Sequence, residues 1–418
     1  MAADILTVST SEIRTLGRCK RLYRYEYVDG RRPASQGHEL VWGAALHRGL
    51  EALYLAVKHG DEDAMTLALH AALTPGVDSE GRPYQPPADP YARAALSAML
   101  RAYVEYWWTD ATTYAIEGVE VPFCLPVRTA RGRLVKGRIC EACGGLGVWS
   151  DQADCPRCSG TGRLRPHREG RIDLVVRERK FVAENITEPD PTGKLWLVEH
   201  KSTTWEPSDE RYYTGIERDL QLALYFDAAR EMGLDPAGVM YDVIRRPAYD
   251  EVKPPPAMKK DGTPRAPASV PCEAEGCVSG YRAVGIVNPV AEPCDKCKGT
   301  GRIVKEVGYS NPRYGESAAA YEERIYDLAT APETRDAWFG RRMLTISEEQ
   351  VRESRAIVHG AVDEIRWREK TGHYPMAGDR YTCAPPKRVC AWIDVCGGRV
   401  SVEDLDRLFP LKIKKEGV

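Results

Sequence analysis

Two short apolar segments carry charged side chains whose types and spacing suit metal-assisted chemistry. Residues 171–176 (Arg-Ile-Asp-Leu-Val-Val) contain Asp173, and residues 195–201 (Leu-Trp-Leu-Val-Glu-His-Lys) contain Glu199 and Lys201. Segments this rich in Val, Leu and Ile predict two paired strands. Because strand side chains alternate, Glu199 and Lys201 share one face, which Asp173 can reach from the neighbouring strand. Such a face suits a divalent cation with a water-orienting group beside it; the alternative is a surface hairpin with an ordinary ion pair.

Two further pairs of residues lie one helical turn apart in predicted helices. Gly43 and His47 are separated by three residues, and so are Gln221 and Tyr225. Residues at this spacing face the same side of a helix. A glycine one turn before a histidine lets another backbone or a ligand come close. The alternative for His47 is a surface histidine beside a helix-packing glycine.

The composition narrows the class of protein. The 418 residues carry a net charge of −2, so no overall basic field predicts nucleic-acid binding, and such contacts would need local basic patches. The sequence starts without a basic segment followed by a long apolar run, and no run of about 18 apolar residues occurs. We therefore expect a cytoplasmic protein without membrane contacts, in which the 13 cysteines bind metal rather than form disulfides.

Four cysteines form two closely spaced pairs in residues 140–162. Each pair has the form Cys-x2-Cys-x-Gly-x-Gly, and the set consists of Cys140, Cys143, Cys155 and Cys158. Four thiolates suit a tetrahedral zinc site, and the glycines permit the tight turns that aim N–H groups at the sulfurs. The repeat resembles a DnaJ-type zinc finger. No His-Pro-Asp sequence occurs in the chain, so this resemblance ends at the module.

A second module of this kind lies in an insertion rich in proline and lysine. Cys294 and Cys297 repeat the Cys-x2-Cys-x-Gly-x-Gly pattern, whereas Cys272 and Cys277 have four residues between them. The longer spacing is still compatible with zinc. We predict a second zinc site and regard the two insertions as internal copies of one module.

Five cysteines remain outside the two modules. Cys383, Cys390 and Cys396 cluster near the end of the chain and need a fourth thiolate to complete a metal site. Cys124 falls in a predicted strand, where a small core residue is the simplest explanation. Cys19 falls in a predicted helix with no other partner.

Periodicity predicts the elements that position these side chains. Helices are expected at residues 11–28 (with Ser11 as N-cap), 42–59, 89–109, 209–232, 315–330 and 346–371 (with a Ser347/Gln350 capping box). Strands are expected at 119–127, 133–139, 171–176, 195–201 and 238–246, with a long loop at 179–194. The expected divisions are an N-terminal helical part with the first strands, a first insertion, a catalytic core, a second insertion and a C-terminal cysteine segment, at residues 1–139, 140–165, 166–250, 251–306 and 307–418.

Four motifs in order resemble the PD-(D/E)xK nuclease superfamily, specifically its RecB-like branch. They are Gly43-x3-His47, Gly170-Arg-Ile-Asp173, Glu199-His-Lys201 and Gln221-x3-Tyr225. That branch includes CRISPR-associated RecB-type exonucleases, the nuclease domains of AddAB-type helicase-nucleases and phage exonucleases. The resemblance spans almost the whole chain outside the two insertions, which it implies lie near the substrate groove, in contact with DNA or with a partner protein. It implies an α/β, restriction-endonuclease-like fold, with a mixed central sheet flanked by helices and the terminal helices clamped by a metal cluster on four cysteines.

The resemblance also implies roles for the candidate residues. Mg²⁺ or Mn²⁺ would be bound by His47, Asp173 and Glu199. Lys201 would position or activate the attacking water, or stabilise charge on the phosphate, while Gln221 and Tyr225 would orient the phosphate or the lysine. Glu120 occupies a position where many relatives keep an acidic residue. The terminal set Cys19, Cys383, Cys390 and Cys396 would hold a [4Fe–4S] cluster, with a four-cysteine zinc site as the alternative.

These roles together imply a metal-dependent DNA exonuclease that hydrolyses phosphodiester bonds at DNA ends in recombination or repair, of phage or prophage type. The chain has no Walker A sequence, so ATP-driven unwinding would need a separate helicase. Analogy with phage exonucleases implies a single-strand annealing protein as another partner. The alternative is a non-catalytic zinc and iron–sulfur DNA-binding or adaptor protein that keeps the nuclease fold. A zinc-finger chaperone accessory would explain the cysteine repeats but not the carboxylates.

Overall fold

The computed structural model of the protein describes most of the chain outside the second insertion. The described residues are 5–34, 37–77, 83–107, 110–148, 153–155, 157–183, 186–188, 190–247, 269–271, 281–284, 290–293, 302–304, 317–377, 379–384 and 389–411. The four cysteines of the second predicted zinc site, Cys272, Cys277, Cys294 and Cys297, lie outside the described residues.

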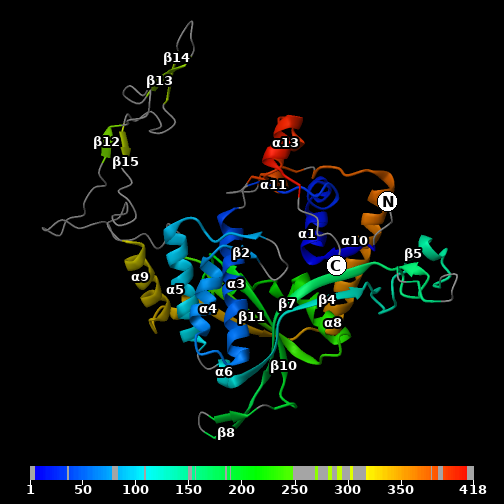
Figure 1. Cartoon of the computed structure of the whole chain (residues 1–418), viewed down its shortest axis with the longest axis horizontal. Coiled ribbons are helices and arrows are strands. Elements are labelled where there is room, and N and C mark those ends of the chain that lie inside the picture. Colours follow the sequence, from blue (N-terminus) through cyan, green and yellow to red (C-terminus); the bar gives the residue numbers. More distant parts are fainter. Residues whose placement is uncertain are drawn as a thin grey trace, which may run out of the picture.

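A six-stranded mixed sheet forms the centre of the molecule (Figure 1). Its order is β1-β7-β10-β11-β16, with β4 also paired to β7. The β1–β7 and β10–β11 pairs are parallel, and the other pairs are antiparallel. The strands are β1 (Thr7–Ser9), β4 (Tyr114–Pro126), β7 (His167–Glu178), β10 (Leu195–Thr203), β11 (Pro236–Arg245) and β16 (Phe339–Leu344). The predicted pairing of the strands that carry Asp173 and Glu199 is confirmed, and so is the mixed α/β fold.

Helices cover both faces of this sheet because its central strands are apolar on both sides. One face packs on α3 (His38–His59), α4 (Ala64–Leu73), α5 (Pro90–Tyr106) and α9 (Ala318–Thr330). The other packs on α1 (Thr10–Arg18), α8 (Leu220–Glu231) and α10 (Glu348–Thr371). Successive side chains of β10 point to opposite faces of the sheet. Val198 packs in the core on the α3 side, and Leu197 packs in the core on the α8 side. The predicted capping box of Ser347 and Gln350 is present at the start of α10.

Short elements connect and extend this core. The helices are α2 (Lys20–Tyr23), a π-helical turn (Arg24–Val28), α6 (Asp110–Thr113), α7 (Glu210–Tyr213), α11 (Arg380–Cys383), α12 (Ile393–Cys396) and α13 (Val402–Leu408), with 3₁₀ turns at Glu141–Cys143, Ile216–Arg218 and Arg335–Ala337. The two-stranded pairs are β2 (Gly76–Val77) with β3 (Pro83–Tyr84), β5 (Arg138–Ile139) with β6 (Arg163–Leu164), β8 (Lys180–Ala183) with β9 (Ile186–Glu188), β12 (Ser269–Pro271) with β15 (Arg302–Val304), and β13 (Tyr281–Val284) with β14 (Val290–Pro293).

The helix predicted over residues 11–28 is interrupted. α1 begins after Ser9, whose hydroxyl accepts from the Glu12 N–H, so Ser9 and not Ser11 is the N-cap. α1 ends at Arg18 because Cys19 adopts an extended conformation, with φ −159° and ψ 120°. Cys19 therefore lies in a break between α1 and α2 rather than within a helix. Because of this break, the direction of the Cys19 side chain is not set by the turn of either helix.

Three other predictions are also wrong in part. The helix predicted over 209–232 is divided at Gly215, whose φ of +83° ends one turn, and α8 begins only after its N-cap Asp219. The strand predicted over 133–139 is reduced to the two residues of β5 and an isolated antiparallel bridge between Leu134 and Arg128. The segment predicted as a loop over 179–194 contains the β8–β9 hairpin.

A buried ion-pair network ties the strand that carries Asp173 to the helices behind it. Arg168 on β7 lies 2.7 Å from both Asp227 and Glu231 on α8. The side chains of Arg168 and Asp227 are only 2% and 1% exposed. Arg355 on α10 contacts Asp227 from the other side at 2.5 Å. Since charges this deeply buried are stable only when paired, the network fixes β7 relative to α8.

Replacing Arg168 with alanine is expected to lower the free energy of unfolding by about 3 kcal/mol, because the buried Asp227 then keeps only the partly exposed Arg355 as an ion-pair partner. Urea denaturation at pH 7 measures this loss. The matched control is Arg352→Ala on α10, which removes an exposed pair with Glu349 and should cost less than about 1 kcal/mol. Equal losses in the two variants would contradict a structural role for the network.

Candidate active site

The site forms where two central strands separate. The β7–β10 ladder runs from the pair Arg177–Leu195 to the pair Leu174–Val198. At the next position the acceptor is a side chain instead of a backbone carbonyl. The backbone N–H of His200 donates to Asp173 Oδ2 at 2.9 Å. Beyond this point β7 pairs with β4 and β1, while β10 continues along β11. The Asp173 carboxylate therefore lies in the gap between two separating strands, held by a backbone donor.

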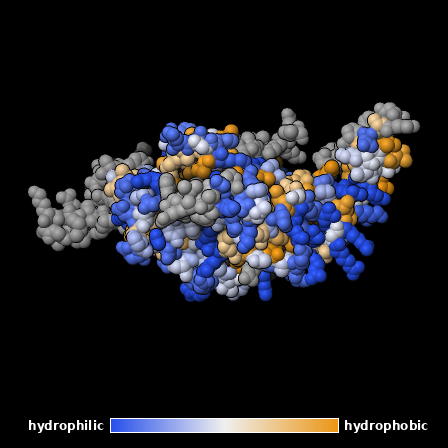
Figure 2. All heavy atoms as spheres, turned by 90° about the horizontal axis from the view of Figure 1, so that it is seen from below, coloured by the Kyte–Doolittle hydropathy of each residue, from blue (hydrophilic) through white to orange (hydrophobic). Residues whose placement is uncertain are grey.

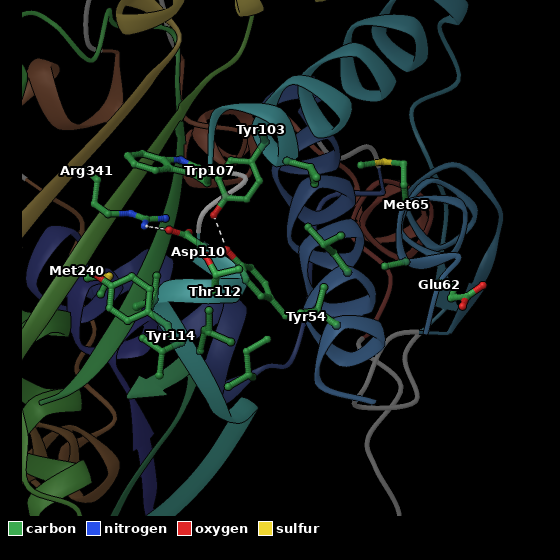
Figure 3. A pocket seen from close by; sticks show the side chains of 18 residues that line it. Tyr54, Glu62, Met65, Tyr103, Trp107, Asp110, Thr112, Tyr114, Met240 and Arg341 are labelled. Atoms are coloured by element: carbon green, nitrogen blue, oxygen red, sulfur yellow. Dashed lines mark hydrogen bonds and ion pairs between the residues drawn. The ribbon is translucent and has the colours of Figure 1, made fainter. Parts of the chain in front are cut away.

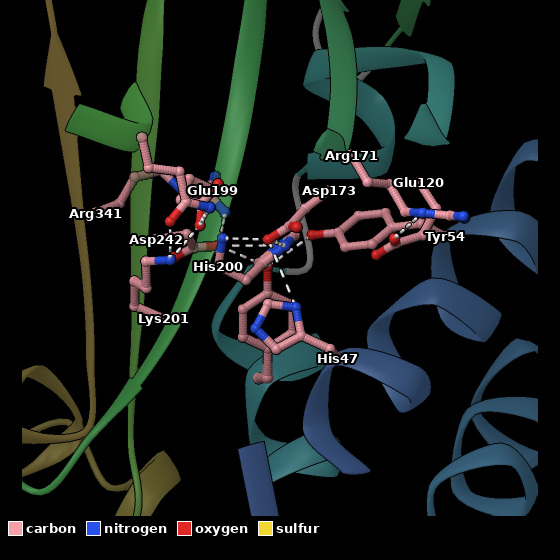
Figure 4. A network of polar contacts seen from close by, with 12 residues as sticks. His47, Tyr54, Glu120, Arg171, Asp173, Glu199, His200, Lys201, Asp242 and Arg341 are labelled. Atoms are coloured by element: carbon pink, nitrogen blue, oxygen red, sulfur yellow. Dashed lines mark hydrogen bonds and ion pairs between the residues drawn. The ribbon is translucent and has the colours of Figure 1, made fainter. Parts of the chain in front are cut away.

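Three possible metal ligands converge on this gap from three elements (Figure 4). The donor atoms of His47 on α3, Glu120 on β4 and Asp173 on β7 all lie within 4.8 Å of one another. His47 Nδ1 is 3.5 Å from Asp173 Oδ2. Glu120 has a φ of +50°, a left-handed conformation that is uncommon for a residue other than glycine. Such strain persists where the surroundings enforce it, which is typical of functional sites.

Glu199 belongs to a second group beside this triad. Its Oε1 accepts from Gln221 Nε2 at 2.7 Å and forms an ion pair with Lys201 Nζ. Lys201 also donates to the side-chain oxygen of Gln221 at 3.2 Å. The other carboxylate oxygen of Glu199, Oε2, is buried and has no hydrogen-bond partner within the described part of the chain. The structure thus brings together the predicted residues Glu199, Lys201 and Gln221.

Tyr225 lies one turn after Gln221 on α8, as predicted. Its ring packs edge-on against Phe123 on β4, with 5.4 Å between ring centroids. A Cβ at position 170 would lie 2.9 Å from this ring, so Gly170 is needed for the close approach of β7. Burial raises the pKa of Tyr225, and the Glu199 and Asp173 carboxylates add to the rise. The phenol is therefore protonated at neutral pH and can act as a hydrogen-bond donor.

Two of the site's carboxyl groups hold their protons unusually strongly in the metal-free protein. Burial raises the pKa of Glu199 to about 8, and the charge of Asp173 adds to the rise against the effect of Lys201. Burial also raises the pKa of Glu120 to about 8, again with a contribution from Asp173. These shifts follow from crowding several acids in a place with little water.

Asp173 and Lys201 behave in the opposite way and stay charged. Burial alone would raise the pKa of Asp173, but His47 and the hydrogen bonds from His200 lower it to about 2. Because burial lowers the pKa of His47, its imidazole is neutral at pH 7. At that pH the hydrogen bonds from His200 are what keeps the pKa of Asp173 low. Burial would lower the pKa of Lys201, but the Glu199 carboxylate raises it above its usual value. The lysine is thus a fixed positive charge in the site.

A divalent cation fits these residues. The triad offers one imidazole nitrogen and two carboxylates as ligands. Glu199 Oε2 adds a buried oxygen without a hydrogen-bond partner among the described residues, and burying such an oxygen costs free energy unless a partner such as a cation is present. The ligand set differs in one respect from the predicted set of His47, Asp173 and Glu199. Glu120 is part of the compact triad, whereas Glu199 faces Lys201 and Gln221.

Behind the triad lies a buried polar network that was not predicted. His200 lies between two aspartates, with its Nδ1 3.7 Å from Asp173 Oδ2 and its Nε2 3.8 Å from Asp242 Oδ2. Tyr103 donates to Asp242 at 2.7 Å, and Arg341 on β16 pairs with the same oxygen at 2.8 Å. One signal was available in the sequence, because Asp242 interrupts an otherwise apolar strand that carries no other acidic residue. A buried acid in such a strand requires partners.

The first cysteine module matches a zinc site closely. Tetrahedral bonds of about 2.3 Å to one zinc ion place sulfurs about 3.8 Å apart. The Sγ atoms of Cys140 and Cys155 are 3.9 Å apart, and those of Cys143 and Cys158 are 3.7 Å apart. The predicted glycine turns are present: the N–H groups of Gly147 and Gly162 donate to the sulfurs of Cys143 and Cys158. The module projects from the body, and hydrophobic side chains gather on it, including Leu146, which is 80% exposed (Figure 2).

The four terminal cysteines also lie in one region, but less closely. The thiols of Cys383 and Cys396 each interact electrostatically with those of Cys19 and Cys390, which together with burial raises their pKa values. This set does not form a group within 4.8 Å as the first module does. The two ends of the chain are joined around it by backbone hydrogen bonds from Arg32 and Ala34 to the carbonyls of Pro410 and Leu408. Cys124 is exposed on β4 and not in the core, contrary to expectation.

Comparison with known proteins assigns the chain to a family. The model of the PD-(D/E)XK nuclease superfamily matches residues 7–397, so the protein belongs to that superfamily, whose members are metal-dependent nucleases. No match was found among curated proteins. Among the described residues, no helix is long and apolar enough to span a membrane.

The raised carboxyl pKa values predict how metal binding depends on pH. Glu199 and Glu120 are protonated in the metal-free protein below pH 8, so a metal ion that needs their carboxylates must displace protons. The affinity for Mn²⁺ should therefore rise from pH 6 to pH 8, by up to about tenfold per pH unit for each proton released, and level off above. Calorimetry in buffers of different ionisation enthalpy counts these protons. Glu199→Gln should release one proton fewer, whereas Glu349→Gln, a change of an exposed side chain on α10, should leave the count unchanged. An affinity that does not depend on pH would contradict the assignment.

Proposed function

We propose that this protein is a metal-dependent DNA exonuclease of the RecB-like branch. It would hydrolyse phosphodiester bonds at DNA ends in recombination or repair, as phage-type exonucleases do. The observation that carries the proposal is the gap between β7 and β10, where Asp173 accepts a backbone N–H and forms a compact triad with His47 and Glu120. Glu199 lies near enough for the charge of Asp173 to raise its pKa. A non-catalytic adaptor would have no need to keep this set of acids together with a charged lysine.

The residues of the chain would divide the work as follows. His47, Glu120, Asp173 and Glu199 would hold Mg²⁺ or Mn²⁺, which when bound lowers the pKa of water and polarises the phosphate. The pKa of Lys201 lies above its usual value, so its role is to stabilise negative charge on the phosphate rather than to accept a proton. Gln221 orients Lys201 through their hydrogen bond. Tyr225, protonated at neutral pH, can donate a hydrogen bond to a phosphate oxygen.

The cysteines would serve structure. The sulfur spacing of Cys140, Cys143, Cys155 and Cys158 supports zinc. The wider terminal set supports a [4Fe–4S] cluster, whose thiolate ligands lie further apart than those of one zinc ion. Such a cluster would clamp the N-terminal helices to the C-terminal segment. The exposed Leu146 on the projecting module suits a partner protein, such as an annealing protein or a helicase, and DNA is the other ligand against which the module can be tested.

Cleavage of end-labelled DNA tests the activity. With Mg²⁺ or Mn²⁺, the wild-type protein should degrade linear DNA and leave closed circles intact, and Asp173→Ala should be more than about 100-fold slower, since even changes behind metal ligands cost 10–100-fold. Asp363→Ala, an exposed aspartate on α10, is the matched control and should keep full activity. Cleavage of circles would overturn the exonuclease assignment, and a wild-type protein that cleaves no DNA would favour the adaptor.

Metal analysis tests the two cysteine sets separately. Cys390→Ser should lose the iron, about four atoms per chain, and the visible absorbance of the cluster, while it keeps the zinc of the first module. Cys155→Ser should lose that zinc and keep the iron. Cys124→Ser, an exposed cysteine outside both sets, should keep both metals. Zinc in place of iron at the terminal set would overturn the cluster assignment.

A further inference from the structure

β10 continues past the metal site with one of its edges open. Its ladder with β7 ends at Val198, whereas its ladder with β11 continues to Thr203. The carbonyl of Thr203 accepts from the Arg246 N–H, so the backbone groups of Thr203 face β11. Because successive residues of a strand turn these groups to opposite edges, the N–H and carbonyl of Ser202 face the gap that β7 has left. In the described part of the sheet, the end of β10 therefore borders the site with no strand along this edge.

Trp205 follows this open edge and presents its ring to solvent. The side chain is 52% exposed, and among the described residues the ring has no aromatic or cationic partner. Trp367 on α10 has a similar exposure of 50%, but its ring contacts His373 and the Arg368 guanidinium. Trp205 comes four residues after Lys201, a span of at most about 14 Å. An uncovered aromatic ring thus lies within a short distance of the lysine of the site.

The segment that carries Trp205 is held in place on both sides of the ring. The backbone N–H of Trp205 donates to Thr203 Oγ1 at 3.1 Å. The next residue, Glu206, pairs with Arg245 on β11 at 3.4 Å, and Pro207 after it is buried. A ring on such a fixed segment loses little conformational freedom when a partner stacks on it, so more of the contact energy remains as affinity.

A basic side chain lies beside the same segment. The backbone N–H groups of Arg246 and Trp205 both donate to Thr203, one to its carbonyl and the other to its hydroxyl. The Arg246 guanidinium pairs with Glu39 on α3 at 3.0 Å, and the Glu39 side chain is 69% exposed. Exposed ion pairs contribute at most about 1 kcal/mol, so Arg246 can exchange this carboxylate for a phosphate at little cost.

The other end of the gap, where β7 and β10 are still paired, offers no path for a charged chain. A cavity of about 330 Å³ lies there between the sheet and the helices α3, α4 and α5 (Figure 3). Its lining is mostly apolar and includes Leu174 and Val198. The arginine of this lining, Arg341, is already held by Asp110 at 2.9 Å and by Asp242 at 2.8 Å. Phosphates would be buried there without a partner, which is costly.

An uncovered ring next to a cation selects single-stranded DNA. Sites for single strands combine a positive charge on the backbone with aromatic side chains on which bases stack. Every base has such a face, so the contact tolerates any sequence. Inside a duplex each base is already covered on both faces by its neighbours, so a ring on the protein surface cannot stack on it.

We propose that the DNA strand leaves the metal site along the open edge of β10, that one of its unpaired bases stacks on Trp205, and that Arg246 contacts a neighbouring phosphate. The proposal rests on the proposed function in taking DNA as the substrate, and it adds that the strand beside the site is single. The subsite holds DNA whether or not the metal site cleaves it, so binding is measurable apart from cleavage.

Fluorescence anisotropy with a labelled oligothymidylate of about 20 nucleotides, longer than one single-strand-binding fold covers, tests the subsite. Every protein in the assay carries Asp173→Asn, which prevents cleavage and keeps an oxygen that can accept from the His200 N–H. Trp205→Ala should weaken binding at least about fivefold, the lower end of what one stacked base contributes. Trp205→Phe keeps a ring and should recover most of the affinity. Trp367→Ala, the matched exposed tryptophan on α10, should leave it unchanged.

Two further measurements separate stacking from a structural effect. A blunt duplex should bind the Trp205→Ala protein as well as it binds the protein with Trp205. A base stacked on an indole quenches its emission, so the quenching that the single strand causes should fall in Trp205→Phe and persist in Trp367→Phe. No binding of the single strand, an equal loss in Trp205→Ala and Trp367→Ala, an equal loss for the duplex, or unchanged quenching would overturn the proposal.

Salt titration of the same binding tests Arg246. Arg246→Ala should reduce the slope of log affinity against log salt concentration by about 0.7, the value for one phosphate contact on a single strand. Arg352→Ala, an exposed arginine on α10, is the control and should keep the slope. An unchanged slope in Arg246→Ala would overturn this contact. Single-strand binding through Trp205 by a protein that cleaves no DNA would overturn the nuclease assignment alone, whereas cleavage by a protein indifferent to Trp205→Ala would overturn the subsite alone.

Discussion

The hydrogen bond from the His200 N–H to the Asp173 carboxylate is the constraint on which the site depends. It ends the β7–β10 ladder with a side chain, so the two strands can separate without leaving a buried donor unpaired. The same bond stabilises the ionised carboxylate. This one interaction thus pairs the buried His200 N–H, allows the gap between the strands and keeps the Asp173 carboxylate ionised. Glu120 and His47 then reach the gap from β4 and α3.

A group of acids this close together would repel if all were ionised. The protein divides them instead: Asp173 is charged, whereas burial keeps Glu120 and Glu199 protonated at neutral pH. Lys201 is held beside Glu199 as a permanent cation. The metal-free site is therefore nearly balanced, and a cation completes it by replacing protons.

The sequence was most informative where the determinants are local. The strands with Asp173 and Glu199 were predictable from apolar runs, and the convergence of four cysteines from the spacing of Cys140 to Cys158. Long-range determinants were not predictable in this way. The break at Cys19 carries no turn residue, and contacts between the two ends of the chain surround it. The closeness of Glu120 to Asp173 depends on the register of β4 against β7. The ion pair between Arg341 and Asp242 depends on the position of β16 beside β11.

The first cysteine module is inserted between β4 and β7, the two strands that carry Glu120 and Asp173. Its root is the β5–β6 pair, where Arg138 lies opposite Leu164, so both ends of the module leave the body side by side. Paired residues of antiparallel strands are only about 5 Å apart. Any folded unit whose two ends lie equally close together can therefore be joined to this strand pair. This hairpin is therefore a natural graft point. A reporter or another small domain can replace the module there while the strands on either side keep their register.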